Sequence, residues 1–501
     1  MREFWPIASR EERLDQLPLP RRCTDYHSWM QFLIWISLAL CLFAQAGGTR
    51  MNVIFILVDD WGWADAGVQG SDFFETPNID RFAQEGMRFT QAYTAASICS
   101  PTRAAIMTGK SPARLDMTIW HEGAMQGGPK KRKLLEAKAQ PNLPREEITI
   151  AELFKKQNYF TMHIGKWHLG RAAYYPETQG YDVNIGGTYW GAPATFYHPY
   201  RGPWSKNDPE LRYVPVGPGQ PGDYLTDKLT DHALRLIEEQ KDRSFFLSLW
   251  FYTVHTPIEG KPALVKHFEK KKPGKIHNHP EYAAMVASMD ENVGRVLRRL
   301  DELKLADNTV VILTSDNGGV DFKTSKSGNI APTQNAPFRS GKGTLYEGGI
   351  RVPLMIRWPG LTKPGTECGM MVTSQDFFPT LAEGFGHRAG DLPKHDGVSL
   401  LPQLRNPKTR PTRKTLYWHY PHYYPRMTPG SAVREENWKL IHYYEDDRME
   451  LFNLRDDPGE TKNLTVTQSN QTKVLRAKLD NWRKATDAKA PVPNPDWLPR
   501  K

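Results

Sequence analysis

Two apolar stretches of this sequence, VIFILV and TVVILT, are each followed by a pair of side chains that offer oxygen atoms. Asp59 and Asp60 follow the first stretch, and Asp316 and Asn317 follow the second after one serine. Carboxylate and amide oxygens are hard ligands that suit Ca²⁺ or Mg²⁺, whereas zinc prefers histidine and cysteine. An Asp-Asp pair after a strand is also a common turn or helix cap, so neither pair establishes a metal site alone.

Three further segments supply positive charge and protons. YFTMHI is followed by Lys166 and His168, FFLSLWFYTV is followed by His255, and Lys342 lies in SGKGTLYEGGIRVP. Any one of these residues has an ordinary structural explanation. Together with a metal, two lysines and two histidines would form a clamp for a tetrahedral oxyanion, as sulfuryl or phosphoryl transfer requires.

One cysteine lies in an unusual context, the segment SICSPTRAAIMTGK. Pro101 suits the first turn of a helix, and Cys99 sits just before that turn. The positive end of the helix dipole would favour an anionic oxygen at position 99. Arg103 lies one turn further on and could donate hydrogen bonds to that oxygen. A buried structural thiol is the default interpretation of any lone cysteine.

Alternating strands and helices must position these groups. Short apolar runs alternate with amphipathic segments, which is typical of βαβ units around a parallel sheet buried on both faces. In such a sheet, ligands bind at the carboxyl ends of the strands, so the polar residues should converge on one crevice. We predict helices over residues 76–86, 148–157, 226–240 and 282–303.

The pattern changes after about residue 390, where tyrosine, tryptophan, histidine and proline cluster in LYWHYPHYYP. NWKLIHYY and MELFNL read as antiparallel strands joined by EDDR, and residues 471–486 read as a helix. We predict an α/β fold with a large, mainly parallel sheet between helices and a smaller C-terminal α+β subdomain with an antiparallel sheet. The expected boundaries are a catalytic domain at 47–388 and a subdomain at 389–501.

The first 46 residues resemble a secretory signal peptide with a long leader. An apolar run at residues 32–44 is too short to span a bilayer, and small residues follow it up to a cleavage site after Ala46. The length of the leader leaves a downstream start codon, for instance at Met30, as an alternative, and a lipid anchor at Cys41 fits poorly because leucine precedes it. We expect an exported protein, periplasmic or secreted, with no stable membrane span after cleavage.

Composition narrows the class of partner. The 501 residues include 66 Lys and Arg against 56 Asp and Glu, a net charge of +10. This balance fits either a solvated surface or a polyanionic partner. No zinc-finger or RNP motif is present, so we expect no nucleic acid. After signal removal only Cys99 and Cys368 remain, which excludes a disulfide framework.

The motifs together resemble the type I sulfatases of the alkaline-phosphatase-like superfamily. C-x-P-x-R at Cys99, followed by AAIMTG, is similar to the signature of that family. NVIFILVDDWGWAD, GKWHLG, HTP, TSDNGG and GKGTLYEGGIRVP match further blocks in the family's order, strongly over residues 51–360. The resemblance implies that a maturation enzyme oxidises Cys99 to an aldehyde, formylglycine (3-oxoalanine). Its hydrate attacks the sulfate ester and later expels sulfate by breaking a C–O bond.

The resemblance also implies a role for each site residue. The metal, calcium in preference to magnesium, would be held by the modified Cys99 and four oxygen donors, namely Asp59, Asp60, Asp316 and Asn317. Sulfate oxygens would be held by Lys166 and Lys342. His255 would protonate the leaving alcohol, and His168 would take the proton from the second hydroxyl. Arg103 would fix the hydrate.

The substrate is the least constrained part. His419 and His422 could bind a sugar or could pack the subdomain, and Thr188 is a weak match to a polar residue near the sulfate. Basic stretches, if they line the cleft, would favour sulfated carbohydrate over a neutral aryl sulfate. The alternatives are a phosphatase, phosphodiesterase or phosphonate hydrolase of the same superfamily, or a homologue that binds sulfated glycans without catalysis.

Overall fold

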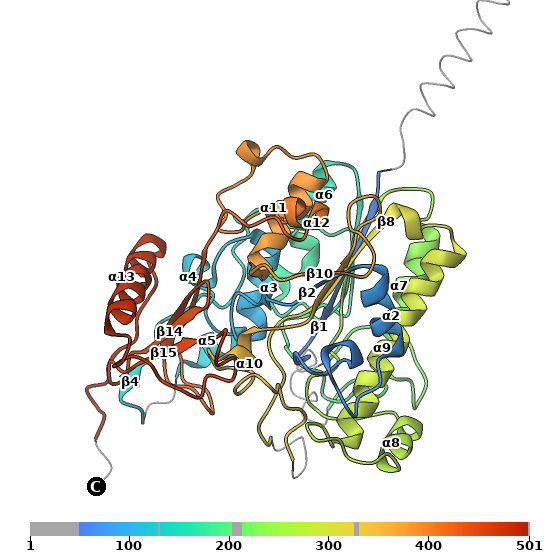
Figure 1. The fold of residues 1–501 in the computed structure, drawn as a ribbon. Helices are drawn as coiled ribbons and strands as arrows, with labels where there is room; N and C mark the ends of the chain where they lie inside the picture. Colours follow the sequence, from blue (N-terminus) through green and yellow to red (C-terminus); the bar gives the residue numbers. More distant parts are fainter. Residues whose placement is uncertain (1–49, 129–130, 203–212, 325–329, 499–501) are drawn as a thin grey trace, which may run out of the picture. The chain divides into compact units, whose positions relative to one another are not determined.

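The computed structural model is organised around one large twisted sheet, and it describes residues 50–128, 131–202, 213–324 and 330–498 (Figure 1). The sheet has eight strands. Their order across the sheet is β10 (Thr366–Cys368), β2 (Met87–Phe89), β9 (Leu354–Arg357), β8 (Thr309–Ser315), β1 (Asn52–Val58), β7 (Phe245–Trp250), β5 (Phe160–Gly165) and β6 (Val183–Ile185).

The middle of this sheet is parallel. β1 pairs in parallel with both β7 and β8, and β5 pairs in parallel with β7 and β6. Only β9 runs against its neighbours β8 and β2 among the described strands of the sheet. Every residue of β1, β7 and β8 is buried, as expected for strands covered on both faces. The predicted α/β class with a mainly parallel sheet is therefore confirmed.

Two layers of helices cover the two faces, and the pleat decides which side chain meets which layer. In β1, Ile54 and Ile56 point into the core formed with one layer, whereas Val53 and Phe55 point into the core formed with the other. The first layer contains α2 (Pro77–Glu85), α7 (Leu225–Glu239), α8 (Pro262–Glu269) and α9 (Pro280–Glu302). The second contains α3 (Cys99–Thr108), α6 (Ile150–Lys156), α11 (Phe377–Gly384) and α12 (Leu401–Arg405).

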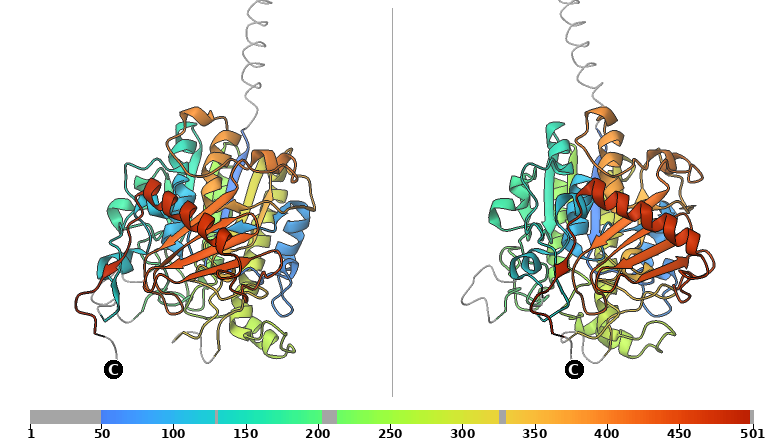
Figure 2. Two further views of the ribbon diagram at one scale, coloured as in Figure 1. Left: turned by 60° about the vertical axis from the view of Figure 1, so that its left-hand side comes forward. Right: turned by 90° about the vertical axis from the view of Figure 1, so that its left-hand side faces the viewer.

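A separate four-stranded antiparallel sheet lies in the C-terminal part (Figure 2). Its strands, in order, are β12 (Thr415–Tyr420), β13 (Gly430–Glu435), β14 (Trp438–Tyr443) and β15 (Met449–Asn453). One face packs on α13 (Ser469–Thr486) through Leu475 and Leu479. The other face packs on Ile98 and Leu345, so this sheet lies against the start of α3.

Short elements complete the fold around the ends of the large sheet. They are the helices α4 (Pro112–Leu115), α5 (His121–Gln126) and α10 (Glu347–Ile350), the pair β3 (Ala92–Tyr93) with β11 (Val372–Thr373), and the pair β4 (Leu134–Leu135) with β16 (Val492–Pro493). No helix in the described part of the chain is both long and apolar enough to cross a membrane. The expected signal peptide at 1–46 lies outside the described residues, and the boundary at residues 388 and 389 stays a prediction.

Candidate active site

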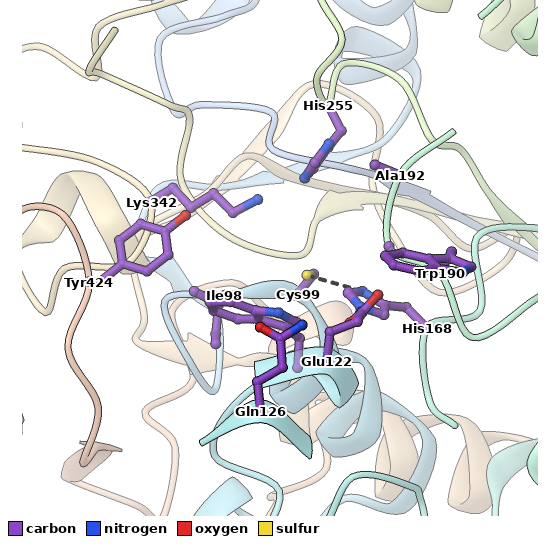
Figure 3. A pocket seen from close by; sticks show the side chains of 12 residues that line it. Ile98, Cys99, Glu122, Gln126, His168, Trp190, Ala192, His255, Lys342 and Tyr424 are labelled. Atoms are coloured by element: carbon purple, nitrogen blue, oxygen red, sulfur yellow. Dashed lines mark hydrogen bonds and ion pairs between the residues drawn. The ribbon is translucent and has the colours of Figure 1, made fainter. Parts of the chain in front are cut away.

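The catalytic candidates gather at the carboxyl ends of four neighbouring strands. β8, β1, β7 and β5 are adjacent in the sheet. The loops after them carry, respectively, Asp316 and Asn317, Asp59 and Asp60, His255, and Lys166 with His168. This is the crevice expected of a parallel sheet. Figure 3 shows Cys99, His168, His255 and Lys342 around a common cavity.

The two aspartates after β1 are each held by a lysine. Nζ of Lys166 lies 2.7 Å from Oδ2 of Asp59, and Nζ of Lys342 lies 2.7 Å from Oδ1 of Asp60. Burial raises the pKa of Asp59 well above its ordinary value despite the nearby lysine. Burial also opposes ionisation of Asp60, but Lys342 and His255 together lower the pKa of that carboxyl. The two adjacent carboxylates therefore experience different electrostatic environments.

Arg103 is directed at a carboxylate. Its Nε donates a hydrogen bond to Oδ2 of Asp316 at 2.9 Å, and one terminal nitrogen donates to the carbonyl of Lys166 at 2.7 Å. The guanidinium is fully buried, with its Cζ 5.3 Å from the ring centre of Trp250. Arg103 therefore fixes the loops after β8 and β5, and its expected hydrogen bond to the hydrated residue 99 stays a prediction.

The oxygen donors at this centre fit a hard divalent cation. Oδ1 of Asp59 and Oδ1 of Asn317 are buried and accept no hydrogen bond from any described residue. Buried acceptors without partners are costly, and a cation between them would remove that cost. Ligand atoms of Asp59, Asp60 and His255 lie within 4.8 Å of one another. Sequence reasoning had not grouped His255 with the ligands, since it was assigned to proton transfer.

Cys99 is the first residue of α3 and lies at the cavity floor. Its side chain is 4% exposed, and Sγ lies 3.3 Å from Nδ1 of His168. Burial raises the pKa of this thiol, but Lys166 and His168 outweigh that effect and lower it to about 6. Residue 99 therefore occupies a position that favours a negative charge, where the helix dipole acts in the same direction.

The two histidines differ in their surroundings. Nε2 of His168 lies 3.2 Å from Oε2 of Glu122, so the ring is held between this carboxylate and Cys99. Burial lowers the pKa of His168, but Cys99 and Glu122 raise it above its ordinary value. Nε2 of His255 lies 3.6 Å from Oδ2 of Asp60. Burial and the charge of Lys342 hold the pKa of His255 well below its ordinary value.

Above these groups lies a cavity of about 360 Å³ whose walls sequence reasoning missed. Its lining includes three aromatic residues, Trp120, Trp190 and Tyr424, and two polar residues, Glu122 and Gln126. Figure 3 shows Tyr424 beside Lys342 on one side and Trp190 on the other. These residues come from α5 and from loops. The only signal in the sequence was the richness in aromatic residues of the segments around positions 190 and 420.

Three residues proposed for the substrate do not line this cavity. Both ring nitrogens of His419 are engaged, one with Ser431 and one with the carbonyl of Lys489. His422 contacts Thr118 and Glu136 in the same way. Thr188 is buried, and its carbonyl accepts a hydrogen bond from the amide of His168. The structure therefore gives all three a supporting position instead of a substrate contact.

Comparison with known proteins decides the family. The sequence profile described as Sulfatase matches residues 51–387. The chain belongs to the sulfatase family. A second sulfatase profile, described as N-sulphoglucosamine sulphohydrolase, C-terminal, matches residues 340–486. The alkaline-phosphatase-like fold expected from the motifs agrees with this assignment, and sulfatases are sulfuric ester hydrolases, so the chain is an enzyme of that class.

Individual sulfatases resemble this one over most of their length. A protein called Sulfatase from Formosa agariphila is 31% identical, with 89% of this chain and 90% of the relative covered. Human steryl-sulfatase is 30% identical, with 74% and 72% covered. The solved structure of Ps i-CgsB in complex with k-i-k-neocarrahexaose has 26% identity and a TM-score of 0.69, covering 90% of this chain and 95% of the other.

Proposed function

We propose that this sulfatase hydrolyses sulfate esters of carbohydrates, with a formylglycine made from Cys99 and one bound calcium ion. The observation that carries the proposal is the position of Cys99. It lies at the floor of the cavity, beside His168, with Lys342 and His255 also in the lining. A sulfate ester placed there would meet two lysines, two histidines and the oxygen donors described above.

The nucleophile is the hydrated aldehyde at position 99. Hydration would give the carbon two hydroxyls, one of which would attack sulfur. Asp59, Asp60, Asp316 and Asn317 would hold the cation, which would supply positive charge to offset that of the sulfate. Sulfatases generally use a formylglycine and a divalent cation, which is consistent with the donor set here. Oxygen donors favour calcium over zinc, and a set of several protein oxygens favours calcium over magnesium, which retains water.

The remaining residues hold charge and move protons. Lys166 and Lys342 each pair with an aspartate of the site, and each ammonium group would donate its remaining hydrogen bonds to the sulfate oxygens. His168 is oriented by Glu122 and lies beside residue 99, where it would accept a hydroxyl proton. His255 would protonate the leaving oxygen. The negative charge of a bound sulfate ester would raise the pKa of His255, which burial and Lys342 lower in the free protein.

A sugar is the alcohol that fits the cavity walls best. Trp120, Trp190 and Tyr424 offer ring faces on which the apolar face of a sugar packs, and Glu122 and Gln126 offer hydrogen bonds to hydroxyls. The similar protein Ps i-CgsB was solved with k-i-k-neocarrahexaose, a carbohydrate. The family also contains steryl-sulfatase, but a sterol has no further hydroxyls with which to hydrogen-bond Glu122 and Gln126.

The test combines peptide mass spectrometry with an assay of sulfate release. The protein is co-expressed with a formylglycine-generating enzyme, and the peptide spanning residue 99 is analysed. We expect an aldehyde at that position and sulfate release from sulfated oligosaccharides. An unmodified thiol, with the maturation enzyme active on a control substrate, would contradict the mechanism. Turnover of aryl sulfates or steryl sulfate with none of a broad panel of sulfated sugars would contradict the substrate class.

We also propose that the protein is exported and that residues 389–501 form a subdomain. The basis for export is the apolar run at residues 32–44 followed by small residues. Determination of the N-terminus of the mature protein from its native host would test it, with a first residue of Gly47 expected. A mature protein that retains residues 1–46 would contradict the assignment.

A further inference from the structure

A second cavity borders the catalytic one and is lined by arginines. We propose that it binds an anionic substituent on the sugar adjacent to the one that carries the cleaved sulfate. The inference rests on the proposed function and makes it narrower, because the substrate would be a glycan with an anion on at least two neighbouring sugars. The anion would be a sulfate ester or a carboxylate, which guanidinium groups recognise through the same hydrogen bonds.

The second cavity, which we call the arginine groove, has a volume of about 230 Å³. Arg132, Arg426 and Arg448 line it, and its lining as described contains no aspartate or glutamate. Tyr424 belongs to the lining of both cavities. The two cavities therefore meet at the same side chain, and a ligand fixed at residue 99 that extends past Tyr424 would reach the groove.

Aromatic rings hold these arginines in place. The guanidinium of Arg448 lies 3.9 Å from the ring centre of Tyr443, that of Arg132 lies 5.2 Å from Tyr423, and that of Arg426 lies 6.0 Å from Phe322. A stacked guanidinium keeps the N–H groups at its edges available for hydrogen bonds in its plane. Such an arrangement is suited to a planar or tetrahedral oxyanion.

Two of the arginines also have acidic partners, which occupy part of their hydrogen-bonding capacity. Arg426 pairs with Asp321, and Arg448 pairs with Glu450 and, at 3.7 Å, with Asp446. Asp321 and Glu450 are largely buried behind the lining, whereas the side chain of Asp446 is exposed. A guanidinium has five N–H donors, and one carboxylate accepts at most a bidentate pair from it. The remaining donors are left to a ligand, while the ion pairs fix the side chains beforehand.

The backbone that carries Arg132 is anchored at a distance in sequence. β4 pairs with β16, and the side chain of Asn494 donates a hydrogen bond to the carbonyl of Arg132 at 2.8 Å. The amide of Leu134 donates to the hydroxyl of Tyr423. The segment 132–135 is therefore held in place by these contacts, and Arg132 has a defined position in the lining of the groove.

Tyr424 is fixed as the divider between the cavities. Gly343 adopts a φ of +82°, and a Cβ built on it would lie 1.9 Å from a ring carbon of Tyr424. The ring thus packs directly on the backbone next to Lys342, one of the proposed sulfate-binding lysines. Only glycine permits both this backbone conformation and this contact.

The test compares substrates in pairs with the mature enzyme. Each pair is a disaccharide with one sulfate at the cleaved position and the same disaccharide with a second anion on the neighbouring sugar. One arm uses a second sulfate and the other uses a uronic acid. 4-Methylumbelliferyl sulfate reports the chemistry without a neighbouring sugar. The variants are Arg132→Ala and Arg426→Gln, with Arg410→Ala as matched control, because Arg410 is exposed and lines a different cavity.

We expect kcat/KM to be about tenfold higher for the doubly anionic substrate of a pair, mainly through KM. Arg132→Ala and Arg426→Gln should remove most of that advantage, leave turnover of the aryl sulfate unchanged, and leave the melting temperature nearly unchanged. Arg410→Ala should have no effect. The advantage should shrink as salt concentration rises, because the groove is partly exposed to solvent.

Different outcomes would contradict the arginine groove and the proposed function. Aryl sulfate and singly sulfated sugars that are both hydrolysed, with no gain from a second anion in either arm, would overturn the arginine groove alone. The same holds if the gain persists in both arginine variants. Loss of all sugar turnover in the unaltered enzyme would instead contradict the carbohydrate substrate class, and loss of aryl sulfate turnover would contradict the sulfatase chemistry.

Discussion

The floor and the rim of the catalytic cavity are built in opposite ways. On the floor, charged side chains follow buried strands and hold one another through short ion pairs such as Lys166 with Asp59 and Arg103 with Asp316. On the rim, Trp190 and Tyr424 come from loops. The floor is rigid because each of its members is a partner of another, whereas the rim depends on how distant segments pack together.

This difference separates the reaction from the choice of substrate. A floor of interlocked charges can hardly change without loss of the whole centre, since removing one member of a buried pair leaves its partner uncompensated. Rim residues on loops, such as Trp190, are not members of these ion pairs, so they can vary while the chemistry stays the same. Each of the following changes tests whether floor residues affect mainly turnover and rim residues affect mainly substrate affinity.

The largest effect should come from Cys99→Ala. Without a side chain that can become an aldehyde, the floor has charge but no nucleophile, and we expect sulfate release to fall by at least about a thousandfold. Release of sulfate from both an aryl sulfate and a sulfated sugar is measured. The fold should survive, as judged by the melting temperature. Residual activity above a hundredth of the original would contradict the assigned role.

Removal of the divalent cation should have the next largest effect. After treatment with a chelator and dialysis, we expect activity to fall by at least about a hundredfold, because the sulfate charge is then neutralised by lysines alone. Calcium should restore it, and magnesium should restore less. The melting temperature should rise on addition of calcium. Full activity in the chelated enzyme, with metal content verified, would rule out a cation at the floor.

A smaller effect is expected from Trp190→Ala on the rim. Loss of one stacking face should raise KM for a sulfated sugar about tenfold and leave kcat within twofold. The matched control is Trp482→Ala, in which a tryptophan that stacks on Tyr417 is removed from α13. A fall in kcat with unchanged KM for Trp190→Ala would place this residue with the floor.

The smallest effect on catalysis is expected from His419→Ala. Burial lowers the pKa of His419 to about 3, so the ring is neutral at pH 7 and carries no charge for a sulfate. Its removal should cost about 1–2 kcal/mol of stability, because Ser431 loses a buried partner. Urea denaturation measures that loss. A severalfold rise in KM with unchanged stability would return His419 to the substrate site.

The parts of the site on regular elements could be predicted from sequence, and the parts on loops could not. VIFILV and TVVILT are recognisable as buried strands, and the residues that follow such strands must lie at one edge of the sheet. Glu122 offers no comparable signal, because α5 has only six residues and follows no strand. It reaches His168 only through tertiary packing, which a sequence pattern does not record.

The aromatic residues of the rim show a second reason why the loop-borne part of the site could not be predicted from sequence. From the sequence, Thr188, His419 and His422 are candidate substrate residues, and neither Trp190 nor Tyr424 is singled out. In the structure both histidines are engaged in internal hydrogen bonds, Thr188 is buried outside the lining, and Trp190 and Tyr424 line the cavity. Which of two neighbours points inward depends on backbone direction within a loop, and loops lack the periodicity that sets this direction in strands.

The burial of α3 imposes an order of events on the life of the protein. All ten residues from Cys99 to Thr108 are buried, including Pro101 and Arg103 of the recognition motif. A maturation enzyme that recognises these residues could not bind them in the folded protein, because they are buried. If Cys99 is converted as proposed, the conversion therefore has to precede folding of this helix, and each molecule has only the time before folding in which to become active. A molecule that folds before this conversion would have the correct fold and no sulfatase activity.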